Sequence, residues 1–190
     1  MRALIFSLCV WLLAACGDGG GVSFKGSDIA GTKLGQHWTL VGMDGKTYTP
    51  ESFRGKVTLV FFGFTQCPDV CPTALAELTQ VMKLLGDRAS QVQVLMISVD
   101  PERDTPEVLS AYISGFNDRF LGLTGSAEQI KAAAGAFKAY YAKVPGAKGN
   151  YSMDHSSSFY LLDKKGDARV MLNSTIGAAA VAHDIEALLR

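Results

Sequence analysis

The chain has 190 residues and a mass of 20.3 kDa, which is the size of one domain with a full hydrophobic core. Its 18 basic residues balance 18 acidic residues, so the sequence lacks the charge footprint of a nucleic-acid-binding protein. The composition, with 48% hydrophobic residues and four cysteines, is that of an ordinary globular domain.

The N-terminus predicts export. Arg2 precedes an apolar stretch, residues 3–15, that is too short for a membrane-spanning helix of about 20 residues. A positive start, a short apolar core and small residues before a processing site make residues 1–15 a secretory signal peptide. The site reads LAAC at residues 13–16 and resembles the lipobox of bacterial lipoproteins, in which the cysteine is lipidated and becomes the mature N-terminus. An ordinary cleaved signal peptide is the alternative.

Residues 16–31 are rich in glycine and have no periodicity, which predicts a flexible tether with an r.m.s. span of roughly 20 Å. This tether would hold a domain of residues 32–190 near the membrane in which Cys16 carries the lipid. We therefore expect a membrane-tethered lipoprotein that faces the periplasm or another extracytoplasmic space, where disulfides can form and persist. Cys67 and Cys71 are the two thiols of the domain.

The first half of the domain alternates strands with a helix. Residues 38–49 carry Asp44-Gly45 between two short strand-like runs, which predicts an N-terminal β-hairpin. Residues 56–64 (KVTLVFFGF) are continuously apolar and predict a strand buried on both faces. Residues 72–85 repeat apolar side chains at spacings of three and four, which predicts a helix. Residues 91–99 predict a second buried strand.

The second half begins with a helix that Thr105 caps and that has Pro106 in its first turn. Residues 120–123 predict a short strand. A capping box then begins a helix over residues 126–141.

The last elements are a hairpin, whose strands are residues 158–162 and 169–173, and a closing helix over residues 177–190. Strand, helix, strand, helix, then hairpin and helix is the order of a thioredoxin-like fold. This is an α/β class with a central mixed sheet flanked by helices. Right-handed crossover connections make the first buried strands parallel.

Two cysteines lie four residues apart where the first buried strand gives way to a helix. Cys67 follows the strand and Cys71 begins the helix, and ligand sites of open α/β sheets lie at such strand ends. Unpaired N–H groups at a helix N-terminus stabilise a thiolate, so we expect lowered cysteine pKa values here. A structural disulfide would close a very short loop and remove little unfolded-state entropy. A redox couple and a metal clamp remain as interpretations.

A metal clamp needs a third donor beside the two sulfurs, and histidine is the usual one. His155 stands just before the strand of residues 158–162, whose start lies at the same sheet edge as the carboxyl ends of the parallel strands. Topology therefore brings His155 toward the cysteines. His37 and His183 are interpreted as surface or packing residues. Asp154, next to His155, either tunes the site or forms a turn.

Three sequence blocks, in order, resemble the Sco/SenC family over about residues 31–188. They are FTQCPDVCP at residues 64–72, VDPERDTP at residues 99–106 and DHSSSFYLLD at residues 154–163. The family is thioredoxin-like in fold. Its members bind copper through the two cysteines and one distant histidine, and they serve the assembly of the dinuclear copper site of cytochrome c oxidase.

The resemblance implies that Cys67, Cys71 and His155 are copper ligands and that the two cysteines are redox-active. It also implies that the protein acts as a copper donor, as a reductant of the acceptor's cysteines, or as both. The expected partners are the copper-site subunit of the oxidase and another copper chaperone or thiol reductant. The ligand types fit independently, because thiolates select Cu(I) and a Cys₂His set also accepts Cu(II). Zinc accepts the same ligands plus water, and only the resemblance argues against it.

Met153 departs from the family pattern, in which a β-branched residue is usual at this position. If the segment is extended, Met153 and His155 share a face. Met153 then either packs or lends a thioether to Cu(I).

Asp100, Arg103 and Asp104 follow the second buried strand and face the same rim of the sheet. They form either a cluster that supports the site and docks a partner, or a salt-bridged loop before a helix. We expect Asp100 to lie nearest the site.

A thiol–disulfide oxidoreductase is the main alternative function. Enzymes of the thioredoxin type usually place a proline just before the strand that faces the cysteines, whereas residues 152–159 contain none and offer His155. A peroxidase is less favoured, because Thr65 lies two residues before Cys67 without the rest of the Pro-x-x-x-Thr-x-x-Cys arrangement. The sequence thus favours a copper carrier over an enzyme.

Overall fold

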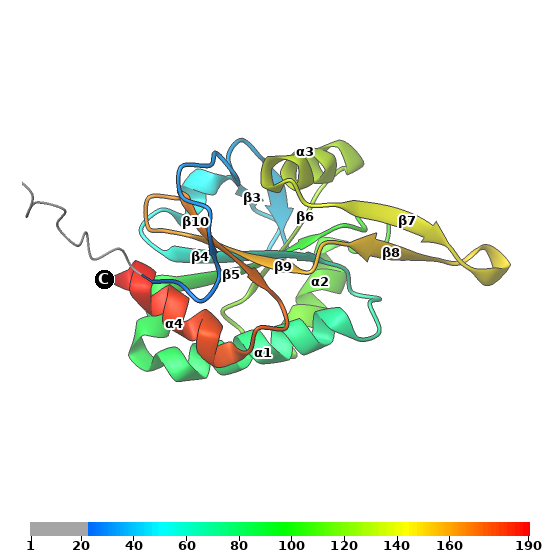
Figure 1. Ribbon diagram of the computed structural model, residues 1–190. Coiled ribbons are helices and arrows are strands. Elements are labelled where there is room, and N and C mark those ends of the chain that lie inside the picture. Colours follow the sequence, from blue (N-terminus) through cyan, green and yellow to red (C-terminus); the bar gives the residue numbers. More distant parts are fainter. Residues whose placement is uncertain (1–22) are drawn as a thin grey trace, which may run out of the picture.

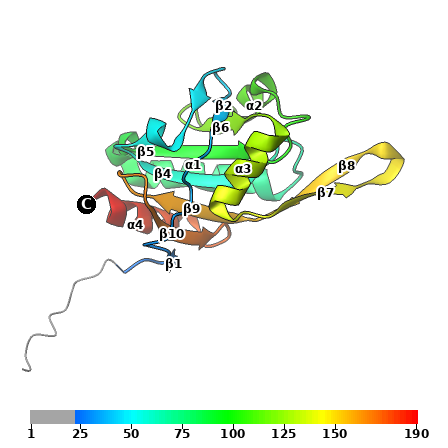
Figure 2. The same ribbon diagram turned by 90° about the horizontal axis from the view of Figure 1, so that it is seen from above.

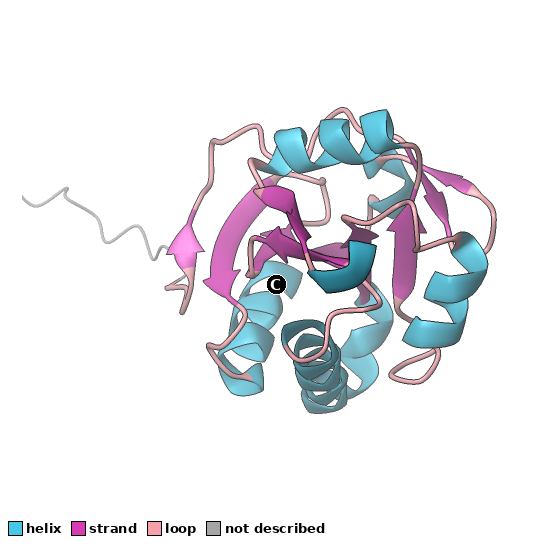
Figure 3. Ribbon diagram, turned by 90° about the vertical axis from the view of Figure 1, so that its right-hand side faces the viewer, coloured by secondary structure: helices cyan, strands magenta, loops and turns pink. Residues whose placement is uncertain are grey.

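The computed structural model describes residues 23–190, in which a mixed β-sheet lies between two layers of helices (Figures 1 and 3). Eight strands follow the order β1-β10-β9-β4-β5-β6-β2-β3. Their bounds are Ser27–Asp28 (β1), Leu40–Gly42 (β2), Thr47–Tyr48 (β3), Val57–Gly63 (β4), Val92–Ser98 (β5), Leu121–Thr124 (β6), Ser158–Leu162 (β9) and Ala168–Asn173 (β10). A separate two-stranded ribbon pairs Tyr141–Pro145 (β7) with Tyr151–His155 (β8).

Helices cover both faces of the sheet. They are Val70–Leu85 (α1), Pro106–Ile113 (α2), Ala127–Phe137 (α3) and Ala178–Leu189 (α4), with 3₁₀ turns at Pro50–Phe53, Gly86–Gln91 and Ala147–Gly149. Buried residues of α1, α2 and α4 share one hydrophobic core, and those of α3 share the other (Figure 1). Thr105 caps α2, and the capping box of Ser126 and Gln129 begins α3, as predicted. The predicted mixed sheet flanked by helices is therefore confirmed.

Strand β4 is the centre of the domain, and all of its residues are buried. Because side chains alternate along a strand, Leu59 and Phe61 enter the core beneath α1, whereas Val60 and Phe62 enter the core beneath α3. The strand runs parallel to β5 and antiparallel to β9, as the sequence predicted. The end of β4 and the start of β9 therefore meet at one edge of the sheet.

The first described residues lie against the domain. Strand β1 pairs with β10, and the backbone N–H groups of Lys25 and Gly26 donate to the buried carboxylate of Asp184 at 2.7 and 2.9 Å. Residues 25–28 were expected within the flexible tether of residues 16–31. The hydrogen bonds place this part of the expected tether in the folded domain.

The predicted signal peptide, residues 1–15, and the lipidated Cys16 lie outside the described residues and stay predictions. The same holds for residues 16–22 of the tether. Across residues 23–190, no helix combines the length and the apolar character that crossing a membrane requires.

The sequence did not predict the ribbon of β7 and β8. We expected a helix to about Tyr141, but α3 ends at Phe137 because Lys138 adopts a left-handed backbone with φ of 54°. Residues 141–155 instead form a hairpin arm that projects from the body of the domain (Figures 1 and 2). The arm ends at His155, so its placement decides where the imidazole lies.

Candidate metal centre

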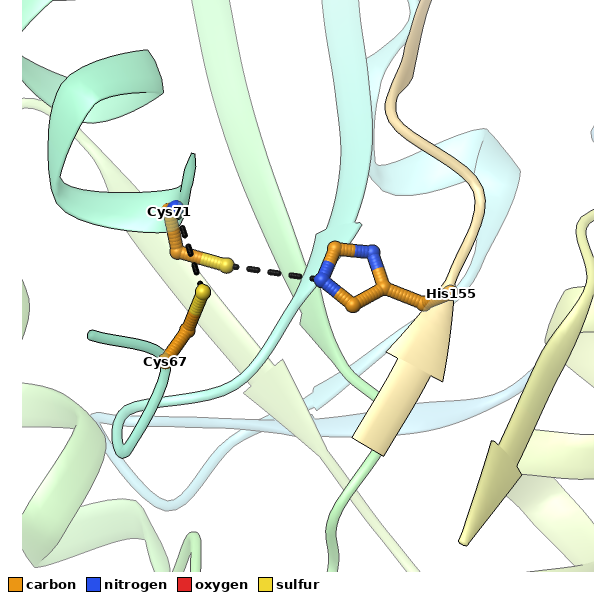
Figure 4. A group of neighbouring side chains, drawn as sticks. All are labelled: Cys67, Cys71 and His155. Atoms are coloured by element: carbon orange, nitrogen blue, oxygen red, sulfur yellow. Dashed lines mark hydrogen bonds between the residues drawn. The ribbon is translucent and has the colours of Figure 1, made fainter. Parts of the chain in front are cut away.

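Cys67, Cys71 and His155 meet at the edge of the sheet (Figure 4). Their sulfur and nitrogen donor atoms all lie within 4.8 Å of one another. The Sγ of Cys71 is 3.6 Å from Nε2 of His155, across 84 residues of sequence. Both cysteines are free thiols. The predicted convergence of two sulfurs and one imidazole is thus present, and the three side chains can hold a metal ion.

The turn between β4 and α1 places the two sulfurs. The N–H of Cys67 donates to the carbonyl of Phe64 at 3.3 Å, and the N–H of Cys71 donates to Sγ of Cys67 at 3.4 Å. Gly63 leaves room for the buried sulfur, because a Cβ at this position would lie 3.0 Å from Sγ of Cys71. Cys71 is buried with 1% of its surface exposed, whereas Cys67 is only half-buried. The two thiols therefore differ in their access to solvent.

Burial raises the pKa of the Cys71 thiol well above its ordinary value. The neighbouring Cys67 raises this pKa further, and a hydrogen bond with the Phe64 backbone opposes the shift only in part. The expectation that the helix start lowers cysteine pKa values is therefore wrong for Cys71, because loss of hydration outweighs the helix N-terminus. A metal ion that binds Cys71 as a thiolate must displace its proton.

His155 turns its Nε2 atom toward the sulfurs (Figure 4). Its Nδ1 lies 3.0 Å from the carbonyl oxygen of Ser156. A carbonyl only accepts, so this contact selects the tautomer of the neutral ring in which Nδ1 carries the proton and Nε2 offers its lone pair to a metal. The ring of Phe64 packs edge-on against the imidazole at 5.8 Å. Asp154, which the sequence leaves as either a tuning residue or a turn former, is exposed, and the polar contact to the imidazole comes from Ser156.

An open pocket of about 310 Å³ lies beside the donors. Residues of the cysteine turn and the start of α1 line one side of this pocket, and residues of β8 and the turn after it line the other. The lining residues are Phe64, Cys67, Pro68, Val70, Ser152, Met153, Asp154, His155 and Ser157. Met153 lines this pocket with His155, as their shared strand face predicted, and it also packs against the core beneath α3. The exposed side of the site is therefore partly apolar and accessible to another molecule.

Asp100 and Asp104, the two carboxylates that follow β5, have different partners. Asp104 is fully buried and accepts hydrogen bonds from the N–H of Thr65 at 3.1 Å, the hydroxyl of Thr65 at 2.6 Å and the hydroxyl of Ser98 at 2.6 Å. The direct bonds to the turn that carries the cysteines thus come from Asp104. Asp100 instead pairs with Arg103. Nothing in the DPERD segment distinguishes the two carboxylates by sequence alone.

The other two histidines are not part of this cluster of donors. His37 is exposed before β2, and His183 on α4 bonds to the carboxylate of Asp184 at 2.8 Å. The hydroxyl of Thr65, the residue on which a peroxidase function would depend, bonds to the carboxylate of Asp104.

The fold and the site define a thioredoxin-like domain with a metal-binding site of two thiols and one imidazole at the edge of its sheet. The SCO1/SenC family model matches residues 27–190, and the chain belongs to this family. An SCO2-like protein of Rickettsia felis is 40% identical over 136 residues, which are 70% of this chain and 66% of that protein. Protein SCO2 of Saccharomyces cerevisiae mitochondria is 41% identical over 70% of this chain and 45% of its own length.

Solved structures of relatives resemble most of the chain. Copper-bound ScoI of Bradyrhizobium japonicum is 39% identical with a TM-score of 0.77, over 82% of this chain and 99% of that chain. Apo Sco1 of Thermus thermophilus is 36% identical with a TM-score of 0.79, over 90% of this chain and 99% of that chain. A SCO1/SenC family lipoprotein of Bacillus anthracis is 26% identical with a TM-score of 0.74, over 88% of this chain and 100% of that chain.

Proposed function

We propose that this protein is a copper carrier that binds one copper ion through Cys67, Cys71 and His155. The observation that carries the proposal is the approach of the three donor atoms to within 4.8 Å of one another. Two thiolates and one neutral imidazole form a soft donor set that suits Cu(I) and accepts Cu(II). The copper-bound relative from Bradyrhizobium japonicum supports copper over zinc for the same fold.

A copper titration of the domain tests this proposal. We expect one tightly bound ion per chain and, with Cu(II), a thiolate charge-transfer absorption band that disappears in His155→Ala. His37→Asn is the matched control, because His37 is exposed and asparagine tolerates its left-handed backbone. Less than one bound ion, or a spectrum that His155→Ala leaves unchanged, contradicts the proposal. Exclusive retention of zinc in competition with copper would instead assign the site to zinc.

The acceptor we propose is the copper-site subunit of cytochrome c oxidase, which fits the family to which the chain belongs. Delivery of copper and reduction of the acceptor's cysteines are two roles that one assay separates. Copper-loaded protein and metal-free reduced protein are each mixed with the acceptor domain, and transferred copper and acceptor thiols are counted. A carrier transfers the ion, whereas a reductant raises the thiol count of an oxidised acceptor without copper.

A thiol–disulfide oxidoreductase is a second candidate, and the unequal exposure of the cysteines favours it. Half-buried Cys67 can attack a substrate disulfide and form a mixed disulfide. Buried Cys71 can then attack the sulfur of Cys67, which releases the substrate as two thiols and leaves a Cys67–Cys71 disulfide, so that two electrons pass to the substrate. This function predicts steady reduction of a model disulfide by metal-free protein in the presence of a thiol reductant. The activity must disappear in Cys67→Ser and persist in His155→Ala. Absence of turnover rules out this candidate.

We further propose that Cys16 is lipidated and that residues 16–22 tether the domain to the extracytoplasmic face of a membrane. The similarity to the Bacillus anthracis lipoprotein supports this arrangement. Fatty-acid labelling in a bacterial host is expected to modify the wild type and not Cys16→Ala. Equal release of both proteins into the soluble extracytoplasmic fraction contradicts the anchor.

A further inference from the structure

Arg103 connects the two segments that carry the donor atoms. Its Nη1 donates to Oε1 of Gln66 at 3.1 Å, and Gln66 immediately precedes Cys67. The same nitrogen donates to the carbonyl oxygen of Tyr151 at 3.1 Å, in the strand that ends at His155. One guanidinium therefore spans the gap between the cysteine turn and the hairpin arm.

The guanidinium is itself held on two further sides. It forms an ion pair with Asp100, whose side chain is 2% exposed, and it stacks on the ring of Tyr151 at 3.8 Å from the centroid. The hydroxyl of Tyr151 donates to Oδ1 of Asp100 at 2.8 Å and closes the cluster. The Arg103 side chain is 17% exposed, so its ion pair with buried Asp100 is largely shielded from water and from salt. Planar arginine suits this combination of stacking and forked donation better than lysine does.

The hairpin arm lacks strand pairing with the main sheet, so contacts of its side chains and of Arg103 hold it against the body of the domain. Among residues 23–190, strands β7 and β8 pair only with each other and project from the main sheet (Figure 1). The cysteines lie in the turn and the helix start that follow the central strand β4. An isolated two-stranded ribbon is only marginally stable in water. The strand hydrogen bonds of the arm therefore fix its internal register but not its distance from Cys67 and Cys71.

We propose that Arg103 is a positioning residue of the metal centre, which locks the arm that ends at His155 onto the turn that carries Cys67. The inference deepens the proposed copper function and rests on it. Without the lock, the imidazole is no longer held beside the sulfurs before the ion arrives. Binding of Cu(II), which depends on the imidazole, then weakens, whereas Cu(I) remains bound by the two thiolates.

Arg103→Lys tests the inference. Lysine keeps a positive charge beside buried Asp100, so the variant avoids an unpaired buried carboxylate, but it cannot reach both Gln66 and Tyr151 while stacking on the ring. We expect Cu(II) affinity to fall about 10- to 100-fold, the usual effect of removing a contact that orients a metal ligand. Cu(I) affinity is expected to stay nearly unchanged.

Lys143→Met is the matched control. Lys143 also lies over the Tyr151 ring, at 3.9 Å, and pairs with exposed Glu102, but it makes no bond to the cysteine turn. This variant is expected to leave both copper affinities unchanged. In the His155→Ala background, Arg103→Lys should cause no further loss of Cu(II) affinity, because the residue acts through the imidazole.

A measurement without copper separates this inference from the proposed function. Hydrogen–deuterium exchange of residues 141–155 in metal-free Arg103→Lys should be faster than in the wild type, with exchange in α1 unchanged. Unchanged exchange in the arm overturns the inference even if the wild type binds no copper. If the wild type does bind copper, unchanged Cu(II) affinity, an equal fall for both ions, or an additive loss in the His155→Ala background also overturns it. A wild type that binds no copper contradicts the proposed function alone.

Discussion

Replacement of Asp104 by alanine should destabilise the domain through the turn that carries the cysteines. The carboxylate is fully buried, and it accepts from the N–H and hydroxyl of Thr65 and from the hydroxyl of Ser98. In Asp104→Ala, these three donors lose their acceptor at a buried position that water does not reach. The turn that begins at Thr65 then loses its attachment to the loop before α2.

The expected loss follows from these bonds and from the burial of the charge. Hydrogen bonds to a charged group contribute about 1.5–3 kcal/mol each, so three bonds are worth roughly 5–9 kcal/mol before any penalty. Burial raises the pKa of Asp104, which shows that the ionised carboxylate also carries a desolvation cost that alanine removes. We therefore expect a net loss of about 3–5 kcal/mol, within the range for three donors left unsatisfied at about 1–3 kcal/mol each.

Urea unfolding followed by circular dichroism measures this loss. With a slope near 2 kcal/mol per molar of urea, the midpoint should fall by about 2 M. Asp118→Ala is the matched control, because Asp118 is exposed and surface substitutions stay within about 0.5 kcal/mol. A midpoint of Asp104→Ala within the error of the Asp118→Ala midpoint refutes the reasoning.

The pH dependence of Asp104 has a defined sign. A carboxyl whose folded pKa is raised contributes stability below its ordinary value of 3.8, and this contribution is lost as pH rises through the raised folded value. The stability of the wild type minus that of Asp104→Asn should therefore decrease with rising pH from about 3.8 upward. A difference that grows across this window contradicts the assignment.

Three further predictions concern the site and the first strand. Copper affinity should increase with pH, with proton release detectable in a weakly buffered titration, because burial keeps Cys71 protonated; a pH-independent affinity contradicts this. Gly63→Ala should weaken copper binding, because its Cβ crowds Sγ of Cys71, whereas Gly115→Ala, which meets only ordinary contacts, should not. Asp184→Asn should speed amide exchange in β1 without changing copper affinity; protection equal to the wild type would exclude this anchoring role.

The central fold and the ligand set could be predicted because local signals agree with the topology. Residues 56–64 are apolar throughout, as a strand covered on both faces must be, and β4 is buried along its whole length. Residues 158–162 form β9 with the predicted bounds, and its antiparallel pairing with β4 brings the segment that carries His155 to the edge of the sheet where the cysteines lie. The spacing of the two cysteines was sufficient to predict them as ligands, and the predicted strand direction identified His155 as the third ligand.

The hairpin arm and the state of Cys71 could not be predicted. Alanine-rich helical sequence continues past Phe137, and the helix ends at Lys138, a residue type with no preference for left-handed backbone. The pKa of Cys71 depends on the depth to which the helix start is buried, which the position of the helix in the sequence does not reveal. The hydrogen bond from Arg103 to Tyr151 could not be predicted either, because it depends on the position of the hairpin arm.

The 84-residue separation between Cys71 and His155 has a thermodynamic consequence. In the unfolded chain the two sulfurs, four positions apart, stay neighbours, whereas the imidazole joins them only when the domain assembles. A soft ion that is bound by the two sulfurs alone stabilises the folded domain only slightly, because the unfolded chain binds it through the same two sulfurs. The part of the affinity that comes from His155 belongs to the native state alone, and this part raises the melting temperature.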